Sequence, residues 1–187
     1  MREHPRKRSF DRVAEAFFAD GRARALSPRT LEQYEWSIRS FRASLGGERA
    51  SDVLADLEPG AVRAWVEALQ RTRRPTSVRT AVRGLKVLGH WVAREGYAGA
   101  DPLATVRLPK APPAVIGPLS GDQVAVLMAA GFPVLRVASA LIADTGIRAS
   151  ELCGLAIDDV REGFLRIRLA KGGRERLVPY GAAATRD

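Results

Sequence analysis

Two short segments in the second half of the chain decide how this sequence is interpreted: TGIRASEL at residues 145–152 and AKGGRERLVP at residues 170–179. In the first segment, Gly146 follows an apolar run and predicts the C-terminal end of a helix. Arg148 and Glu151 lie three residues apart, so a helical turn that begins here places both side chains on one face. The second segment contains a lysine followed by two glycines, which is typical of a tight turn.

The pattern around these segments predicts helices followed by a β-hairpin. The spacing of apolar residues predicts helices over 120–128 and 133–145, with further helical turns over 148–155. The period then changes to two over residues 164–169, and a second strand follows over 174–180. Some apolar positions are expected to be incompletely covered, because so small a domain buries a low fraction of its surface. These positions are Leu141, Ile142, Leu152, Leu155, Ile167 and Leu169.

The first half of the chain predicts four amphipathic helices. Ser9 is expected to cap the first, which ends near Gly21, and Ser27 followed by proline predicts the start of the second. The third helix is expected to begin near residue 58, and Ser77 is expected to cap a fourth that continues to Gly96. Their apolar stripes are sufficient to close a small bundle core.

Prolines at positions 109, 112, 113 and 118 predict a linker between two domains. A segment of this kind is extended and poor in helix. The predicted organisation is therefore a helical domain over residues 1–105, a linker over 106–118 and a second domain over 119–187.

The charge of the chain is concentrated in its first part. The 187 residues include 30 Lys and Arg against 21 Asp and Glu, a net charge of +9. Residues 1–110 carry 21 basic and 13 acidic side chains, whereas residues 111–187 carry 9 and 8. Such a basic surface favours a polyanionic partner, usually nucleic acid. The alternative is a solvated surface rich in arginine.

Composition excludes several other classes of protein. A single cysteine excludes a disulfide framework, and two distant histidines offer no metal cluster, so no metal site is expected. The apolar stretches are too short to cross a bilayer, and the basic N-terminus has no apolar region behind it. A cytoplasmic protein without a membrane partner is therefore expected.

In this order and spacing, the two segments resemble the tyrosine recombinase (phage integrase) family. The first is similar to the family's T-G-[LI]-R-x-S-E-L box and the second to its K-G-x-K/R-x-R-x-V-P hairpin. The four-helix part, its Asp101-Pro102-Leu103 ending and the proline-rich linker resemble the family's core-binding domain and its connection. The resemblance implies a mainly α fold: an N-terminal four-helix, SAM-like core-binding domain followed by a partial α/β catalytic domain of helices and a hairpin.

The resemblance also implies roles for individual residues. Arg148 would be the first catalytic arginine, because a guanidinium offers a permanent charge and several donors to the transition-state phosphate. Glu151 would orient the active-site arginines, and Lys171 would protonate the leaving 5′ oxygen. The family reaction cleaves and rejoins DNA through a 3′-phosphotyrosine and needs no metal or nucleotide cofactor. The implied partners are double-stranded DNA and protomers of a full-length recombinase on that DNA.

A strip of basic residues on the fourth predicted helix is the candidate DNA contact. Arg79, Arg83 and Lys86 are spaced four and three apart, and Arg73 and Arg74 precede them. The spacing places the three on a face distinct from the apolar stripe, so we expect the strip to contact phosphates.

The sequence departs from the family's pattern in its nucleophile. It has no histidine after His90, hence no His-x-x-Arg box, and its last tyrosine is Tyr180, directly after Val178-Pro179. The family has a strand-end residue at that position, so Tyr180 is not expected to be the nucleophile. We therefore expect a recombinase fragment that binds DNA but does not transfer strands alone.

Two alternatives remain open at this point. The chain could be a non-catalytic DNA-binding protein that regulates or competes with a full-length recombinase. The coding DNA beyond Asp187 would separate these readings, since a frame encoding the missing box and a tyrosine would indicate truncation. A helical scaffold protein is the other alternative, and binding that is insensitive to salt would favour it.

Overall fold

The computed structural model describes residues 9–46, 53–112, 117–130, 132–168 and 175–181. It divides into two compact units, residues 1–114 and 115–187, which are described separately below. The described residues are mainly α-helical with one small antiparallel sheet, as the sequence predicts.

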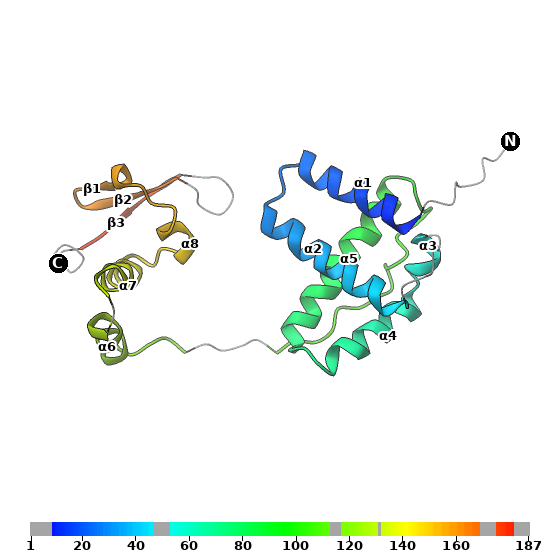
Figure 1. Ribbon diagram of the computed structural model, residues 1–187, viewed down its shortest axis with the longest axis horizontal. Helices are drawn as coiled ribbons and strands as arrows, with labels where there is room; N and C mark the ends of the chain where they lie inside the picture. The colour runs from blue at the N-terminus through cyan, green and yellow to red at the C-terminus, as the bar shows by residue number, and fades with distance from the viewer. Residues whose placement is uncertain (1–8, 47–52, 113–116, 131, 169–174, 182–187) are drawn as a thin grey trace. The chain divides into compact units, whose positions relative to one another are not determined.

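The described residues of the first unit form five helices around one apolar core (Figure 1). They are α1 (Phe10–Ala23), α2 (Pro28–Ser44), α3 (Val53–Asp56), α4 (Pro59–Gln70) and α5 (Pro75–Arg94). Helix α5 packs against α1, α2 and α4, and its apolar stripe forms the centre of the core. The four long helices match the prediction. The short α3 was not predicted, because four residues are too few to show a helical period.

The beginnings of the helices follow the sequence rules in part. A proline occupies the first turn of α2, α4 and α5, where the missing N–H costs nothing. Ser27 caps α2 as predicted, its hydroxyl accepting a hydrogen bond from the Thr30 amide at 3.2 Å. The cap predicted at Ser77 is wrong: α5 begins two residues earlier, at Pro75, and Arg74 is its N-cap. Ser9 precedes α1 but makes no side-chain cap bond.

The segment after α5 folds back onto that helix. Leu103 and Val106 are buried in the core of the first unit. The Lys86 ammonium donates hydrogen bonds to the carbonyls of both residues, at 2.5 and 2.7 Å. Arg79 donates to the Pro109 carbonyl at 2.9 Å. Packing of the first unit therefore continues past residue 105.

The described residues of the second unit form three helices, a 3-10 turn and a small sheet (Figure 1). Its elements are α6 (Gly121–Ala130), α7 (Pro133–Thr145), α8 (Ala149–Leu152), a 3-10 turn (Ile157–Asp159), β1 (Val160–Arg161), β2 (Phe164–Ile167) and β3 (Arg176–Pro179). The strands are antiparallel in the order β1-β2-β3. In the β2–β3 pair, Leu165 lies opposite Val178 and Ile167 opposite Arg176. The hairpin is as predicted, and β1 adds an edge strand that was not.

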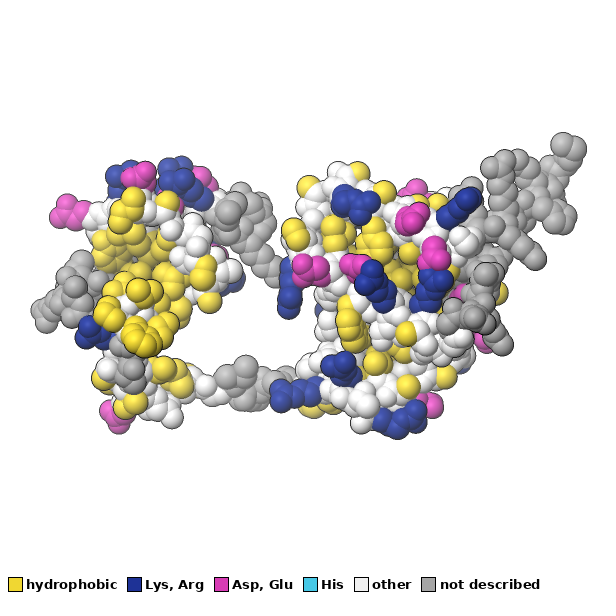
Figure 2. Space-filling view, in the orientation of Figure 1, with side chains coloured by type: hydrophobic (Ala, Val, Ile, Leu, Met, Phe, Trp, Pro, Cys, Tyr) yellow, Lys and Arg dark blue, Asp and Glu magenta, His cyan; other side chains and the backbone are white. Residues whose placement is uncertain are grey.

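The core of the second unit is small, and apolar side chains remain on its surface. Ile147, Leu165 and Ile167 are buried, with Leu141 and Leu152 among the half-buried residues around them. The expectation that Ile167 is incompletely covered is wrong, because Ile167 is only 2% exposed and belongs to this small core. Leu169 lies outside the described residues. Figure 2 shows exposed hydrophobic side chains gathered over this unit. Those on α6 and α7 or next to them are Val126, Leu127, Phe132, Val134, Leu135, Val137 and Ile142.

Within the described part of the chain, none of the helices combines the length and the apolarity needed to cross a membrane.

Candidate functional site

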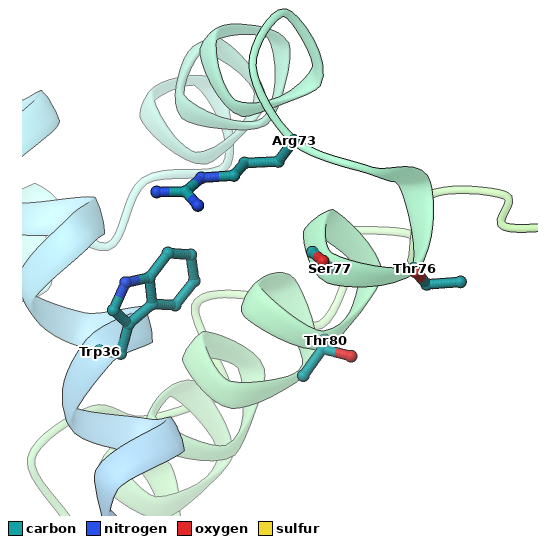
Figure 3. A pocket seen from close by; sticks show the side chains of 5 residues that line it. All are labelled: Trp36, Arg73, Thr76, Ser77 and Thr80. Carbon is teal, nitrogen blue, oxygen red and sulfur yellow. The ribbon is translucent and has the colours of Figure 1, made fainter. Parts of the chain in front are cut away.

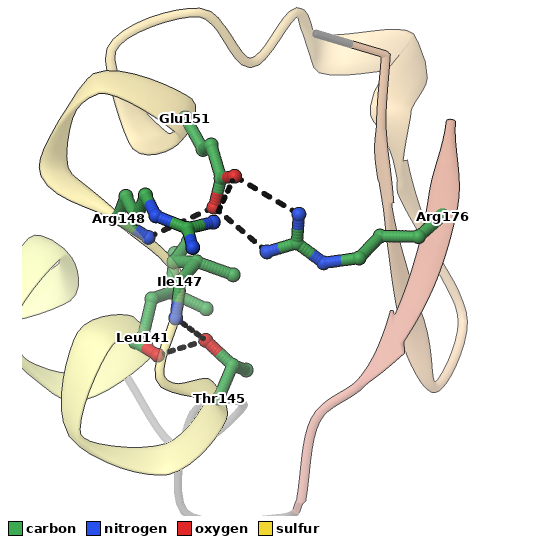
Figure 4. Close-up of polar contacts among 6 residues, drawn as sticks. All are labelled: Leu141, Thr145, Ile147, Arg148, Glu151 and Arg176. Atoms are coloured by element: carbon green, nitrogen blue, oxygen red, sulfur yellow. Dashed lines mark hydrogen bonds and ion pairs between the residues drawn. The ribbon is translucent and has the colours of Figure 1, made fainter. Parts of the chain in front are cut away.

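A sharp turn at the end of α7 positions Arg148. Gly146 has a φ of 65°, in the left-handed region that favours glycine, and its amide bonds back to the Ile142 carbonyl. The helix thus ends where the sequence predicts. Thr145 bridges the turn, because its hydroxyl donates to the Leu141 carbonyl and accepts a bond from the Ile147 amide (Figure 4). Ile147, the residue before Arg148, is buried, so packing as well as hydrogen bonds holds the backbone that leads into Arg148.

Glu151 receives hydrogen bonds from two arginines. Its side chain is only 2% exposed. It accepts bonds from the Arg148 amide and from Arg148 Nη1, each at 2.9 Å. Arg176 of β3 binds both carboxylate oxygens, with Nη1 at 2.9 Å and Nη2 at 2.7 Å. The three side chains point toward one another in Figure 4. We call Arg148, Glu151 and Arg176 the arginine–glutamate cluster.

These contacts keep Glu151 ionised. The side-chain bonds from Arg176 and the backbone and side-chain bonds from Arg148 outweigh burial and lower its pKa from 4.5 to about 2. Two guanidinium groups therefore face one carboxylate, and the cluster has a net charge of +1. The Arg148 side chain is 59% exposed and carries five N–H donors, of which those on Nη1 face Glu151. The cluster thus offers a fixed, exposed cation that suits an anionic ligand such as a phosphate.

Arg176 was missed by the sequence analysis. It lies on β3 on the same side as Val178 and is partly covered, whereas Leu177 between them is 63% exposed. The sequence indicates it only through strand periodicity: Arg176 shares the covered face of the strand with Val178, and a covered arginine needs an acidic partner. Only the fold identifies that partner as Glu151, which is 25 residues away in the sequence.

A second buried carboxylate supports the loop that leads into the sheet. Asp159 accepts a hydrogen bond from the Ala156 amide at 3.0 Å and another from Arg168 Nε at 2.5 Å. The bond from Ala156, and then those from Arg168, lower the pKa of Asp159 against the effect of burial. These contacts fix the connection between α8 and β1.

Lys171 and Tyr180, the other residues considered in or just after the second segment, differ in what the structure describes. Lys171 lies outside the described residues. Tyr180 packs against the small core, and its hydroxyl donates to the Arg161 carbonyl at 2.7 Å. The amide of Gly181 donates to Asp144 at the end of α7, also at 2.7 Å. Tyr180 therefore holds the end of β3 against β1 and the small core.

Two residues of the predicted basic strip bond to the chain itself, and the other three are exposed. Arg79 and Lys86 donate to backbone carbonyls of the segment that follows α5. Arg73 lies over the Trp36 ring, with its guanidinium carbon 5.9 Å from the ring centroid. Arg74 and Arg83 are exposed. The strip and the arginine–glutamate cluster lie in different units.

No group of three or more His, Cys, Asp or Glu suited to a metal ion occurs among the described residues.

Comparison with known proteins identifies the family. Residues 119–186 match the model of the phage integrase family. XerC tyrosine recombinase of Mycobacterium bovis BCG is 33% identical over 170 residues, which are 84% of this chain and 56% of the relative. XerC of Mycobacterium sp. strain JLS is 32% identical over 174 residues, 86% of this chain and 58% of the relative. The chain thus spans a little over half the length of these curated relatives.

Solved structures share the fold. A lambda integrase tetramer bound to a Holliday junction superposes with a TM-score of 0.74 at 19% identity, covering 92% of this chain and 51% of that one. The Tn1549 transposon integrase with transposon right-end DNA gives a TM-score of 0.63 at 16% identity, covering 92% and 62%. The segments 145–152 and 170–179, the match to the family model and the XerC relatives agree, and the chain belongs to the tyrosine recombinase (phage integrase) family.

Proposed function

We propose that the chain binds duplex DNA and presents Arg148 to a backbone phosphate, as the DNA-binding and first catalytic portion of a site-specific tyrosine recombinase. The observation that carries this proposal is the arginine–glutamate cluster, in which a buried carboxylate fixes an exposed guanidinium. In the family reaction, DNA is cleaved and rejoined through a 3′-phosphotyrosine.

The geometry of Arg148 suits stabilisation of a transition state. Attack on a phosphodiester gathers negative charge on the non-bridging oxygens, and a donor that is already oriented stabilises this charge without reorganising. Glu151 holds the Arg148 side chain and backbone together, and Arg176 holds Glu151 from the sheet. Arg176 is therefore a positioning residue. Lys171 keeps its proposed role in protonating the leaving oxygen on the strength of the family resemblance alone.

The first unit supplies the sequence-independent part of DNA binding. Arg73, Arg74 and Arg83 are the proposed phosphate contacts, on the part of the chain that holds most of the net charge. Arg79 and Lys86 contribute their charge, but their side chains donate hydrogen bonds to backbone carbonyls of the chain itself. Lambda integrase has been solved as a dimer on core-site DNA and as a tetramer on a Holliday junction. These assemblies support DNA and other recombinase protomers as partners.

We expect DNA binding without a covalent DNA–tyrosine adduct. The three tyrosines of the sequence are Tyr34, Tyr97 and Tyr180. Tyr34 packs against Phe17, and Tyr97 stacks near Trp91, both in the first unit. Tyr180 donates its hydroxyl to a backbone carbonyl. This engagement of Tyr180 also favours the second candidate function, a non-catalytic DNA-binding protein that regulates or competes with a recombinase.

The experiment combines a binding assay with a test for covalent adducts. Fluorescence anisotropy with a duplex of about 30 base pairs should show affinity that falls steeply with salt, because phosphate contacts release counterions. Arg148→Ala should reduce the salt slope by about 0.9, whereas Arg136→Ala, which removes the same charge from α7, should change it less.

The adduct test uses a nicked duplex and a denaturing gel. We expect no shifted band with the wild type. A covalent adduct that disappears in Tyr180→Phe would refute the assignment of Tyr180, and affinity independent of salt would favour the scaffold alternative. Equal effects of the Arg148 and Arg136 substitutions would favour the non-catalytic DNA-binding protein.

A further inference from the structure

One tryptophan of the first unit is placed differently from the other two. The Trp65 and Trp91 side chains are buried, and their indole N–H groups donate to Ser40 and Asp20. Trp36, on α2, is 41% exposed. The indole of Trp36 thus leaves a large aromatic surface available for contact with a partner.

Trp36 forms one wall of a surface hollow between α2 and the N-terminal turns of α5 (Figure 3). The hollow has a volume of about 350 Å³, and its other walls are Arg73, Thr76, Ser77 and Thr80. Arg73 lies over the indole at 5.9 Å from the ring centroid, which restrains the ring through a cation–π contact. An aromatic ring, a guanidinium and three hydroxyl-bearing residues thus line one hollow.

The acidic residues around the hollow are paired with arginines, and one further arginine carries an excess positive charge. Glu32 and Glu35, which flank Trp36 on α2, pair with Arg29 at 3.8 Å and with Arg39 at 2.8 Å. Arg73 therefore adds a positive charge that neither of these carboxylates neutralises by a direct pair. A surface with this excess positive charge favours a polyanionic partner over a protein without net charge.

We propose that Trp36 is a specificity-determining residue that contacts the methyl group of a thymine in the major groove of duplex DNA. This inference rests on the proposed function, since it assigns a role within DNA binding. The major groove is wide enough for an α-helix, and the thymine methyl is the apolar group that base pairs display there. Ser77 and Thr80 line the same hollow as the indole, and their hydroxyl groups are of the type that bonds base edges, while Arg73 supplies a charge for the phosphates.

The test removes the methyl group without changing anything else. The full chain first selects duplexes from a pool with a randomised core, and each thymine of a selected duplex is then replaced singly by deoxyuridine. At one position, the replacement should weaken binding by about three- to fivefold, as expected for one buried methyl. Trp36→Ala should bind the thymine duplex more weakly and be insensitive to the replacement, and Trp36→Phe should retain part of the difference.

A second measurement reports contact directly. Because Trp65 and Trp91 are buried, collisional quenching by acrylamide reports chiefly on Trp36. The selected duplex should lower the quenching constant of the wild type, and in Trp36→Phe it should change little. The corresponding single strand should protect less, because Arg73 restricts access to the ring for stacking with an unpaired base.

The outcomes separate the two proposals. If the chain binds duplexes in a salt-dependent way but every deoxyuridine replacement is neutral, or if Trp36→Ala keeps the wild-type difference, the role of Trp36 is refuted and DNA binding stands. If no duplex binds even at low salt, both proposals fail. Quenching protection by a protein but not by DNA would assign the hollow to a protein partner and overturn the inference.

Discussion

The sequence and the structure lead to different expectations for the role of Lys86. The sequence places it in a strip of DNA contacts, whereas the structure places its ammonium against the carbonyls of Leu103 and Val106 at 2.5 and 2.7 Å. Replacement by methionine keeps an unbranched side chain of similar length and removes both hydrogen bonds. We therefore expect Lys86→Met to lower stability.

The size of the effect follows from these two bonds. A hydrogen bond from a charged donor contributes about 1.5–3 kcal/mol. The two bonds share one partly exposed ammonium and are not additive, so we expect a loss of about 2–3 kcal/mol. In a domain of this size, 1 kcal/mol shifts Tm by about 4–8 °C, so the expected decrease is roughly 8–24 °C.

The control is Arg83→Met, on the same helix and exposed. All three tryptophans lie in the first unit, so urea unfolding followed by their fluorescence reports on that unit. We expect Arg83→Met to change the unfolding free energy by less than about 0.5 kcal/mol. It should instead reduce the salt slope of DNA binding by about 0.9, as expected for one lost phosphate contact. Equal stability of the two variants would refute the tether assigned to Lys86.

Two further predictions concern the arginine–glutamate cluster and the contact between α2 and α5. Because the pKa of Glu151 is lowered from 4.5 to about 2, the stability it provides is complete above pH 4.5 and is lost as pH falls toward 2. Carbon-detected NMR titration should give this low pKa, and Arg176→Ala should raise it; an unchanged value would contradict the cluster. A Cβ at Gly84 would lie 2.5 Å from Ser37 Oγ and 2.9 Å from Ser37 Cβ. Gly84→Ala should therefore destabilise the first unit by about 1–3 kcal/mol in urea unfolding, with recovery in the double variant with Ser37→Gly, and a more stable single variant would contradict this close approach.

Local features of the fold were predictable because their causes are local. The four long helices follow from apolar stripes, the start of α2 follows from Ser27 and Pro28, and the end of α7 follows from Gly146. Helix α5 begins earlier than predicted because proline at its first position is itself a sufficient start, and no serine cap is needed.

The site was only half predictable because its contacts cross the fold. Arg148 and Glu151 are near neighbours in sequence, so their pairing follows from helical geometry. The pairing of Arg176 with Glu151 depends on the register of β2 with β3 and on the placement of α8. The tethering of Lys86 depends in the same way on the return of the chain after α5. Spacing on one helix predicts which side chains share a face, but not what packs against that face.

The exposed apolar residues of α6 and α7 give the two units opposite responses to ionic strength. Added salt should weaken the nucleic-acid binding that we propose for the basic first unit. The second unit carries almost no net charge, so salt removes little repulsion there, and salting-out ions strengthen the tendency of its apolar face to leave water. If the chain binds DNA as proposed, a high-sulfate wash that strips nucleic acid from it is also the condition under which we expect it to precipitate most readily. We expect chloride at moderate concentration, with a mild detergent to cover the α6–α7 face, to release any bound nucleic acid and to keep the chain in solution.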